Sequence, residues 1–440
     1  MSAGGERTYV VPGRVELVGK HVDYAGGRSL TCAVDRAITA TVRELAEPVI
    51  RVRDEGKRGF VEAPLSANLE RGHGSKRRGT YVVAVARRFA RDFPHARTGI
   101  DVTLRSTLPP SAGLSSSSAL VVAIASALVA ANPRDDDDAW SVIFSNPLAR
   151  AEYFGAMETG APYGPFAGDD GVGARGGAQD HVAIVCARDG HVGQFSYVPA
   201  RLERYVPWPA DYALVIGVSG VRATKTGNAR ARYNRVSDSA RALLRSWNAA
   251  TARSDATLGA ALVSDPGAGE RLARLAALGA GEFDGRYLGP RFAQFREEVE
   301  VIVPAAGDAL RDADFEKLGS VVDRSMSLAT TALANQVPET IYLARRAREL
   351  GAVAASAFGA GFGGAVWAMI RASDAEGFVA RWRSGYIQNY PRREPHTDWL
   401  ITRPGPPARL ALGSDPEGKA RGLWPLGATR LAQRRAAGAV

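Results

Sequence analysis

Residues 108–119 read Leu-Pro-Pro-Ser-Ala-Gly-Leu-Ser-Ser-Ser-Ser-Ala and run directly into an apolar segment that continues to Ala131. Small residues let a backbone approach a ligand closely, and a helix N-terminus presents unpaired N–H groups at the positive end of its dipole. Together these features make an anion site, for which phosphate is the usual occupant. No Gly-Lys-Ser/Thr follows, so the stretch is not a Walker A loop. Because a flexible linker would not continue into a buried helix, we expect a phosphate-binding turn at the start of a core helix.

Two further loops are rich in small residues. Residues 12–27 read Pro-Gly-Arg-Val-Glu-Leu-Val-Gly-Lys-His-Val-Asp-Tyr-Ala-Gly-Gly and place a polar cluster after a predicted strand. Paired hydrogen bonds from Asp and His suit a polyhydroxylated ligand. Residues 356–365 read Ser-Ala-Phe-Gly-Ala-Gly-Phe-Gly-Gly-Ala, a pattern that tight turns also use. Each of these loops alone is compatible with an ordinary turn.

The composition is that of an ordinary globular protein, with 440 residues of which 45% are hydrophobic and 23% charged. It excludes a collagen, a coiled coil and a disordered chain, and the length predicts more than one domain. Two cysteines exclude a disulfide framework and favour a reducing, cytoplasmic location. No apolar signal segment is found, and the run from Ala119 to Ala131 is too short for a membrane span of ~20 residues. We therefore expect no membrane association.

The formal net charge is +10, from 56 Lys and Arg against 46 Asp and Glu. Half of this excess lies in residues 401–440, and the remainder follows a chain-wide preference for Arg over Lys. Charge alone is evidence about solubility and partners, and no RRM, zinc or helix-turn-helix signature accompanies it. A nucleic-acid-binding function is disfavoured, and no nucleic acid is expected as a partner.

β-branched runs bounded by Gly or Pro predict strands, and amphipathic or apolar runs predict helices. The predicted strands are Thr8–Val18, Leu30–Glu44, Pro48–Asp54, Thr98–Arg105, Tyr212–Ser219 and Trp399–Thr402, and the predicted helices are Tyr81–Phe93 and Ser115–Ala131. Pro207-Trp-Pro209 is typical of a hinge, and helical patterns dominate after it to about Leu350. We divide the chain into an N-terminal domain of residues 1–207, a second domain of residues 208–402, and a basic tail of residues 403–440 rich in Arg, Ala and Gly.

The order of the three loops resembles the three signature motifs of the GHMP small-molecule kinases, a family that includes the galactokinases. Residues 12–27 are close to the galactokinase motif Pro-Gly-Arg-Val-Asn-Leu-Ile-Gly-Glu-His-Thr-Asp-Tyr-Asn-Gly-Gly, and the resemblance covers roughly residues 8–402. It implies an α+β fold with a ribosomal-S5-like N-terminal domain, a ferredoxin-like C-terminal domain and an active site in the interdomain cleft. It also implies ATP- and Mg²⁺-dependent phosphoryl transfer to the anomeric C1 hydroxyl of a hexose or hexose derivative.

The resemblance assigns roles to individual residues. Asp180 matches the Asp that faces the phosphoryl-accepting hydroxyl, and Arg14 matches the arginine that positions this Asp and the transferred phosphoryl group. Ser117 matches a serine that holds Mg²⁺, with Glu152 and Glu158 as candidates for the glutamate beside it. ATP would lie over Pro110, Ser111, Ala112, Gly113, Leu114, Ser115, Ser116, Ser117 and Ser118. The residues that match sugar-binding positions, besides Lys20, are His21, Asp23, Gly177 and Tyr233.

The chain departs from the galactokinase pattern at two positions. Lys20 stands where galactokinases have a Glu that contacts the C6 hydroxyl, and Glu16 stands where they have Asn. Lys20 either recognises an anionic C6 group such as a uronic acid carboxylate, or it pairs with Glu16 while a different hexose is bound. A uronic-acid 1-kinase is therefore one alternative, and a non-catalytic sugar and ATP sensor that regulates a partner is another. The presence of the catalytic residues argues against the sensor, and the sequence leaves the oligomeric state open.

Overall fold

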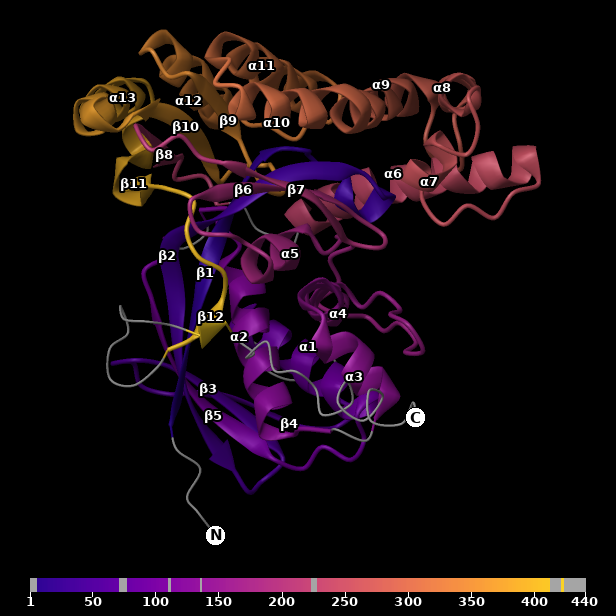
Figure 1. The fold of residues 1–440 in the computed structure, drawn as a ribbon, viewed down its shortest axis with the longest axis vertical. Helices are drawn as coiled ribbons and strands as arrows, with labels where there is room; N and C mark the ends of the chain where they lie inside the picture. The colour runs from indigo at the N-terminus through magenta and orange to yellow at the C-terminus, as the bar shows by residue number, and fades with distance from the viewer. Residues whose placement is uncertain are drawn as a thin grey trace, which may run out of the picture.

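Two sheets organise the part of the chain that the structure, a computed structural model, describes: residues 6–70, 77–109, 112–134, 137–222, 228–411 and 421–422. One sheet is built mainly from the N-terminal half of the chain and the other from the C-terminal half, and helices pack against each (Figure 1). The predicted α+β fold with two domains is confirmed.

The larger sheet contains nine strands among the described residues, in the order β13-β12-β1-β2-β5-β3-β4, with β6 pairing with β2 and β7 with β6. Their bounds are β1 Arg7–Val18, β2 Arg28–Leu45, β3 Val49–Asp54, β4 Val61–Pro64, β5 Gly99–Ser106, β6 His191–Ser196, β7 Arg201–Pro207, β12 Arg409–Leu410 and β13 Arg421–Gly422. The pairing of β1 with β2 has bulges between Pro12 and Arg14 and between Glu16 and Val18. Bulges redirect side chains and are common beside active sites.

Helix α2 lies at the centre of the first domain. It contacts β1, β2 and the neighbouring helices, and its residues from Ser118 to Val129 are buried. A helix that is apolar on every side is stable only inside a core, so the sequence itself requires this position. The helices of this domain are α1 Arg77–Asp92, α2 Ser116–Ala131, α3 Asp138–Ser145, α4 Pro147–Thr159 and α5 Gln179–Val185.

The second sheet has the order β11-β8-β10-β9, and every neighbouring pair in it is antiparallel. In chain order these strands are β8 Tyr212–Val218, β9 Ala354–Ala357, β10 Ala365–Arg371 and β11 Asp398–Thr402. Helices lie between the first and second of these strands and between the third and fourth, which is the ferredoxin-like arrangement. The helices packed near this sheet are α11 Phe315–Thr331, α12 Pro338–Glu349 and α13 Ala375–Asn389.

A helical arm is inserted between β8 and α11 and extends to one side of the molecule (Figure 1). It consists of α6 Asn228–Thr251, α7 Leu258–Leu262, α8 Ala268–Leu278, α9 Gly285–Glu297, the π-helical turn η2 Glu298–Ile302 and α10 Val303–Arg311. The arm has its own apolar core, which includes Trp247 and Phe295. Val22 and Ala25 of the first domain belong to the same cluster. The arm is therefore packed onto the loop that follows β1.

The sequence predicts that the basic tail of residues 403–440 lies outside the fold, but part of it belongs to the first domain. β12 pairs with β1, and Gly405 N donates to Ala33 O at 2.9 Å. Ala408 is buried and donates to Ile184 O at 2.9 Å. Residues 403–411 therefore complete the edge of the first sheet, while the rest of the predicted tail, apart from residues 421–422, lies outside the described residues.

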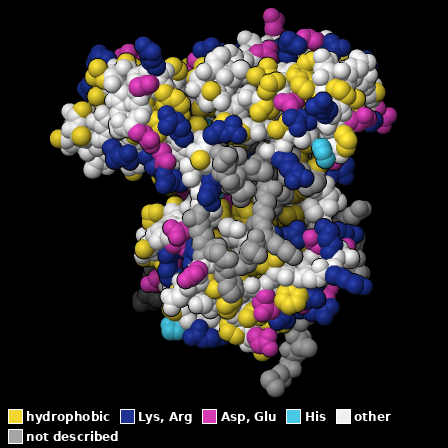
Figure 2. Space-filling model, turned by 180° about the vertical axis from the view of Figure 1, so that it is seen from behind, with side chains coloured by type: hydrophobic (Ala, Val, Ile, Leu, Met, Phe, Trp, Pro, Cys, Tyr) yellow, Lys and Arg dark blue, Asp and Glu magenta, His cyan; other side chains and the backbone are white. Residues whose placement is uncertain are grey.

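Charged side chains of both signs are interspersed over the face shown in Figure 2. Among the ion pairs of the described residues, Arg296 lies 2.8 Å from both Glu270 and Glu300. Exposed pairs of this kind contribute about 0–1 kcal/mol each. Both cysteines are free and buried. None of the helices in the described residues is long and apolar enough to cross a membrane.

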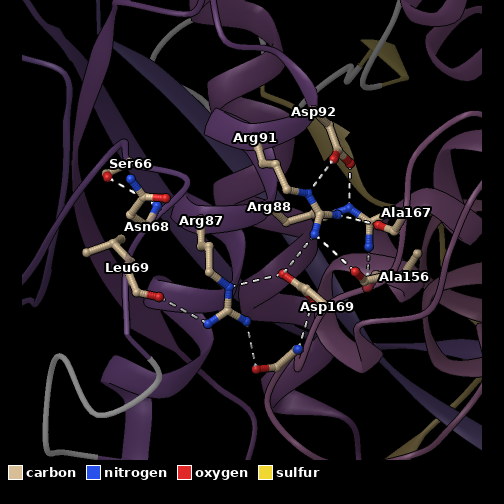
Figure 3. A network of polar contacts seen from close by, with 12 residues as sticks. Ser66, Asn68, Leu69, Arg87, Arg88, Arg91, Asp92, Ala156, Ala167 and Asp169 are labelled. Carbon is tan, nitrogen blue, oxygen red and sulfur yellow. Dashed lines mark hydrogen bonds and ion pairs between the residues drawn. The ribbon is translucent and has the colours of Figure 1, made fainter.

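A buried network of ion pairs ties α1 to the end of α4 and the segment after it (Figure 3). Arg88, which is fully buried, pairs with Asp92 and donates to Ala161 O at 2.8 Å. Tyr153 Oη donates to the same Asp92 carboxylate at 3.1 Å. Arg87 donates to Asp169 Oδ2 at 3.0 Å. The network holds both sides of the excursion over residues 160–171.

Two glycines close this excursion at its base. Gly160 and Gly171 both have positive φ. A Cβ on Gly160 would lie 2.2 Å from Asp169 O, and a Cβ on Gly171 would lie 2.4 Å from Glu158 O. Val172 N donates to Glu158 O at 2.8 Å. The excursion therefore returns the chain to the end of α4, and the buried network fixes the backbone of Glu158.

Arg88→Met is expected to lower the free energy of unfolding by about 1–3 kcal/mol, because it removes the fully buried partner of Asp92 and leaves only the more exposed Arg91, whose Nε lies 3.1 Å from Asp92 Oδ1. Urea unfolding of the full chain measures this change. Arg53→Met is the matched control, since Arg53 forms a half-exposed pair with Asp101 at 2.8 Å and its loss is expected to cost about 0–1 kcal/mol. Equal destabilisation by the two variants would contradict the larger contribution expected of the buried Arg88–Asp92 pair.

Candidate active site

Asp180, in the first turn of α5, is held by groups from β1 and from the start of α2. Arg14 Nε and one terminal nitrogen lie 2.8 and 2.6 Å from Asp180 Oδ1, and Ser115 Oγ donates to Oδ2 at 2.7 Å. The side chain of Arg14 is 4% exposed and that of Asp180 13% exposed. Hydrogen bonds between charged groups are short and strong, so the carboxylate has a fixed orientation. The predicted pairing of Arg14 with Asp180 is present in the structure.

Local backbone geometry places Arg14 in this position. The bulge after Pro12 interrupts the pairing of β1 with β2, and Arg14 N donates to Leu114 O at 3.2 Å. A Cβ on Gly13 would lie 2.8 Å from Leu114 O, so only glycine permits this approach of β1 to the loop before α2. Arg14 also donates to Gly113 O at 2.6 Å. The first two sequence motifs therefore meet at one arginine.

The glycine-rich loop of residues 356–365 meets them from the second domain. A Cβ on Gly359 would lie 3.4 Å from Gly113 O and 3.6 Å from a terminal nitrogen of Arg14. A Cβ on Gly113 would in turn lie 3.6 Å from Phe358 O. The three motifs, which are far apart in the sequence, thus line the junction of the two domains.

The first turn of α2 separates Asp180 from a second cavity. Ser115 and Ser118 are three positions apart and lie on the side of Asp180, as helical spacing requires. Ser116 and Ser117 line the opposite side, a cavity of about 640 Å³ that also contains Tyr81 and Arg78. This volume lies within the range of about 300–1,000 Å³ that is typical of small-molecule sites.

The backbone at the start of α2 leaves its N–H groups available to an anion. Ser115 has a left-handed φ of 57° and makes no side-chain capping hydrogen bond, because its hydroxyl donates to Asp180. Gly113 has a φ of 80°, while Ala112 and Leu114 are buried. The predicted ATP-binding residues Pro110 and Ser111 lie outside the described residues.

The predicted metal ligands are only partly brought together. Ser118 Oγ lies 2.8 Å from Glu158 Oε2 and 3.3 Å from Asp180 Oδ2. His181 Nε2 lies 3.2 Å from the same Glu158 oxygen. No group of three or more His, Cys, Asp or Glu side chains in the described part of the chain has the geometry of a metal site. A serine with one or two carboxylates nevertheless fits Mg²⁺, which takes its remaining ligands from phosphates and water.

Two of the predicted ligands lie elsewhere, which corrects the sequence analysis. Ser117 points into the larger cavity, because it is one helical position before Ser118 and thus lies on another side of the turn. Glu152 accepts a hydrogen bond from Ala200 N at 2.6 Å. Glu158 is six residues further along α4 and accepts from the Ser118 hydroxyl at 2.8 Å, so of the two predicted glutamates it is the one beside Asp180.

The predicted sugar-binding residues surround the cavity on the other side of Asp180. Its lining includes His21, Asp23, Gly177 and Tyr233. A Cβ on Gly177 would lie 2.5 Å from Asp23 Oδ2, so glycine is required where this carboxylate approaches the backbone. The rings of His21 and Tyr233 are 5.2 Å apart. Acidic oxygens, an imidazole and aromatic rings in one cavity suit a polyhydroxylated ligand.

A chain of hydrogen bonds orients His21. Its Nε2 lies 3.1 Å from Ala360 O and its Nδ1 lies 3.1 Å from Tyr24 Oη. Because a carbonyl can only accept, Nε2 carries a proton and donates it to Ala360 O. Arg291 of the helical arm donates to Tyr24 Oη at 3.1 Å and to His21 O at 2.7 Å. The arm therefore fixes a side chain of the first domain that is predicted to bind sugar.

Lys20 does not line the cavity, which corrects its assignment as a substrate-binding residue. It is 1% exposed, and its Nζ lies 3.8 Å from Glu16 Oε1. Glu298 of η2 is the second carboxylate near this lysine; it accepts from Gly19 N at 2.9 Å and from Ser325 Oγ at 2.5 Å. Of the two alternatives for Lys20, the structure has the pairing with Glu16.

Sequence reasoning did not identify several groups of the site. Gln179 donates through its side chain to Glu16 Oε2 at 2.7 Å and through its backbone N–H to Asp23 Oδ2 at 3.2 Å. Its position beside Asp180 was the signal that could have indicated it. Arg291 and Glu298 had no such signal, because they reach the loop after β1 from about 270 residues away in the sequence.

Burial raises the pKa of Glu16 to about 7, against the lowering effects of Lys20, Arg14 and Gln179. A carboxyl group whose pKa is higher in the folded than in the unfolded state binds extra protons when folded, so stability is lost as the pH rises. The loss begins above the unfolded pKa of about 4.5 and is complete above about 7.

We therefore compare the free energy of unfolding of the wild type with that of Glu16→Gln. As the pH rises from 4.5 to 8, the wild-type value is expected to decrease by about 3 kcal/mol relative to the value of the variant. Urea unfolding at a series of pH values measures this difference, in which the contributions of other groups cancel. A difference that stays constant with pH, or that changes in the opposite direction, would contradict the raised pKa.

Three family models match the chain in the order in which the motifs occur. The galactokinase galactose-binding signature matches residues 2–44, the GHMP kinases N terminal domain matches residues 80–147, and the GHMP kinases C terminal model matches residues 308–388. The first match contains the β1 motif with Arg14, Lys20 and Asp23. The second contains the serine-rich start of α2.

Sequence relatives extend the similarity over most of the chain. The galactokinase of Lacticaseibacillus casei strain BL23 is 24% identical over 393 residues, which covers 85% of this chain and 88% of that protein. The galactokinase of Thermococcus kodakarensis is 26% identical over 381 residues, covering 86% and 94% respectively.

The same fold occurs in solved structures. Lactococcus lactis galactokinase complexed with galactose superposes with a TM-score of 0.73 at 19% identity, covering 92% of this chain and 95% of that one. Methanococcus jannaschii mevalonate kinase superposes with a TM-score of 0.51 at 13% identity, covering 91% and 98%. With the three family models matched in order and the motif residues assembled at the domain junction, the chain is similar to the GHMP kinases and, within them, to the galactokinases.

Proposed function

We propose that the chain is an ATP- and Mg²⁺-dependent sugar kinase that phosphorylates the anomeric C1 hydroxyl of a hexose or hexose derivative. The observation that carries this proposal is the position of Asp180. Its carboxylate, fixed by Arg14 and Ser115, lies between the polar cavity around Asp23 and the start of α2. The galactokinase relatives support the choice of a sugar as the acceptor.

In this proposal Asp180 accepts the proton of the sugar hydroxyl while the phosphoryl group is transferred. Arg14 holds Oδ1 of Asp180 and supplies positive charge beside the transferred group. The N–H groups at the start of α2 bind the phosphates of ATP, and the cavity that Ser116 and Ser117 line accommodates the rest of the nucleotide. Most of the rate enhancement then comes from positioning and electrostatics, as is general in phosphoryl transfer.

Ser118 and Glu158 are the residues that would hold Mg²⁺ in this proposal. Their oxygens are 2.8 Å apart at the end of α4 nearest to α2, on the same side as Asp180. When bound, Mg²⁺ neutralises phosphate charge and orients the phosphates. The backbone of Glu158 is fixed by the excursion over residues 160–171, so the carboxylate has a rigid base.

The two alternative functions are weakened by particular contacts. A uronic-acid kinase that uses Lys20 would need its ammonium group in the cavity, whereas Lys20 lies beside the buried carboxylates of Glu16 and Glu298. A sensor would have no need of the Arg14–Asp180 ion pair, because sugar and nucleotide can be bound without it. Both alternatives are nevertheless decided by the same assay.

Release of ADP is expected in the presence of ATP, Mg²⁺ and one or more hexoses, and a coupled assay across hexoses, uronic acids and amino sugars measures it. Phosphorylation at C1 removes the reducing end, so the product is expected to lose its reaction with reducing-sugar reagents. If no sugar gives turnover while ATP still binds, the protein is a sensor. A product that remains reducing would place the phosphate on another hydroxyl.

Asp180→Asn is expected to lower kcat by about 10²–10⁴-fold, because the amide cannot accept the hydroxyl proton. Nucleotide affinity, measured by equilibrium titration, is expected to stay unchanged. Asp189→Asn is the matched control, since Asp189 is exposed beyond the end of α5. Full activity in Asp180→Asn would remove this residue from its proposed role.

Glu158→Gln is expected to raise the Mg²⁺ concentration needed for half-maximal activity by about 10-fold or more. Glu152→Gln is the control on the same helix and is expected to leave this concentration unchanged, because its oxygen can still accept from Ala200 N. Titration of Mg²⁺ in the ADP-release assay measures both. The reverse outcome would assign the metal to Glu152 after all.

A further inference from the structure

Glu16 lines the predicted sugar cavity and carries one carboxylate oxygen, Oε1, that makes no hydrogen bond. Its side chain is 4% exposed and is among the residues that line this cavity. Oε1 makes no hydrogen bond in the structure, and its only charged neighbour within 4 Å among the described residues, Lys20 Nζ, lies at 3.8 Å, beyond hydrogen-bond distance. A buried acceptor without a donor is costly unless a ligand or water supplies one.

Gln179 holds this carboxylate in the same wall as a predicted sugar ligand. The Gln179 side chain donates to Glu16 Oε2 at 2.7 Å, and its backbone N–H donates to Asp23 Oδ2 at 3.2 Å. One residue thus bridges two carboxylates and fixes which Glu16 oxygen remains unbonded. The orientation of Oε1 is therefore set by the protein before any ligand arrives.

Lys20 lies behind Glu16, away from the cavity. Its Nζ also makes no hydrogen bond in the structure, and its charge acts on both Glu16 and Glu298. Glu298 is fully buried and is held by Gly19 N and by Ser325 Oγ. Two carboxyl groups thus lie near one ammonium, and Arg14 also acts on Glu16. Burial raises the pKa of both carboxyl groups.

We propose that Glu16 is a specificity-determining residue whose Oε1 accepts a hydrogen bond from a hydroxyl group of a neutral hexose, while Lys20 is an internal counter-ion that does not touch the sugar. The substrate class is then neutral hexoses, and hexuronic acids are excluded because a second carboxylate would meet Glu16 in a site with little water. The inference deepens the proposed function and rests on it, since it assigns a contact in the sugar site of that function.

Sugar binding tests this inference without requiring turnover. Calorimetric titrations in the presence of a non-hydrolysable ATP analogue would first compare galactose, glucose and mannose. They would then use the monodeoxy derivatives of the hexose that binds most tightly, and the hexuronic acids that correspond to the three hexoses. For the wild type, removal of one particular hydroxyl is expected to weaken binding by about 10- to 100-fold, the range for a hydrogen bond to a charged group. Tighter binding of a hexuronic acid than of any neutral hexose overturns the proposal, as does a failure of every neutral hexose to bind.

Substitution of Glu16 identifies the hydroxyl that it contacts. In Glu16→Ala the same deoxy sugar and its parent are expected to bind within about twofold of each other, because the partner of that hydroxyl is gone. In the isosteric Glu16→Gln variant, which keeps the fold if Glu16→Ala does not, affinity for the hexuronic acid is expected to rise by about 10-fold or more. The proposal is overturned if the variants that fold keep the wild-type pattern of deoxy-sugar and hexuronic acid affinities.

Glu298→Gln is the matched control, because Glu298 shares Lys20 but does not line the cavity. In this variant the sugar affinity is expected to depend on each hydroxyl group as it does in the wild type. If Glu298→Gln and Glu16→Ala lose this dependence equally, the effect comes from the charge of the cluster, and the proposed direct contact is overturned. Failure of the proposed function is distinguishable, because a protein that binds hexoses with this pattern but releases no ADP would be a sensor with Glu16 still in its proposed role.

Discussion

The ion pair between Arg14 and Asp180 joins elements that are distant in the chain and orients the groups around it. Arg14 comes from the bulged strand β1, Asp180 from the first turn of α5, and Ser115 from the start of α2. With both oxygens of Asp180 occupied, the carboxylate cannot rotate freely, and the two cavities acquire a fixed relation to it. A pair this deeply buried is itself costly, so its stability depends on the close packing that glycines allow around it.

The predicted acceptor cavity is lined mainly by the first domain, with Tyr233 and Ala360 from the second, and the second domain also holds it in shape. Arg291 and Gln294 of the helical arm bond the backbone of His21 and Lys20 respectively, and Val22 packs into the core of the arm. The loop after β1 would otherwise be a polar segment with few contacts of its own. Because side chains on loops gain precision only from rigid support, the arm is as much a part of the sugar site as the residues that line it.

Much of the fold followed from local patterns, while the site followed only in part. The apolar run after Ser115 had to be a central helix, and the glycine motifs had to be places of close approach. Which serine of the run faces Glu158 depends on the rotation of one helical turn, and a small error in that angle exchanges Ser117 for Ser118. Glu152 and Glu158 lie on one helix and look alike in sequence; tertiary contacts alone, such as that of Glu152 with Ala200 N, separate them.

The reversal of charge at Lys20 illustrates why a single position is a poor guide to specificity. Considered alone, a lysine in a sugar-binding motif suggests an anionic substrate. Its environment supports the opposite proposal, because Glu298 from the helical arm and Glu16 from the preceding strand both lie near the buried lysine. The group that reaches the cavity is the carboxylate of Glu16. In the proposed function, substrate preference depends on the buried neighbours of a motif residue and not on that residue alone.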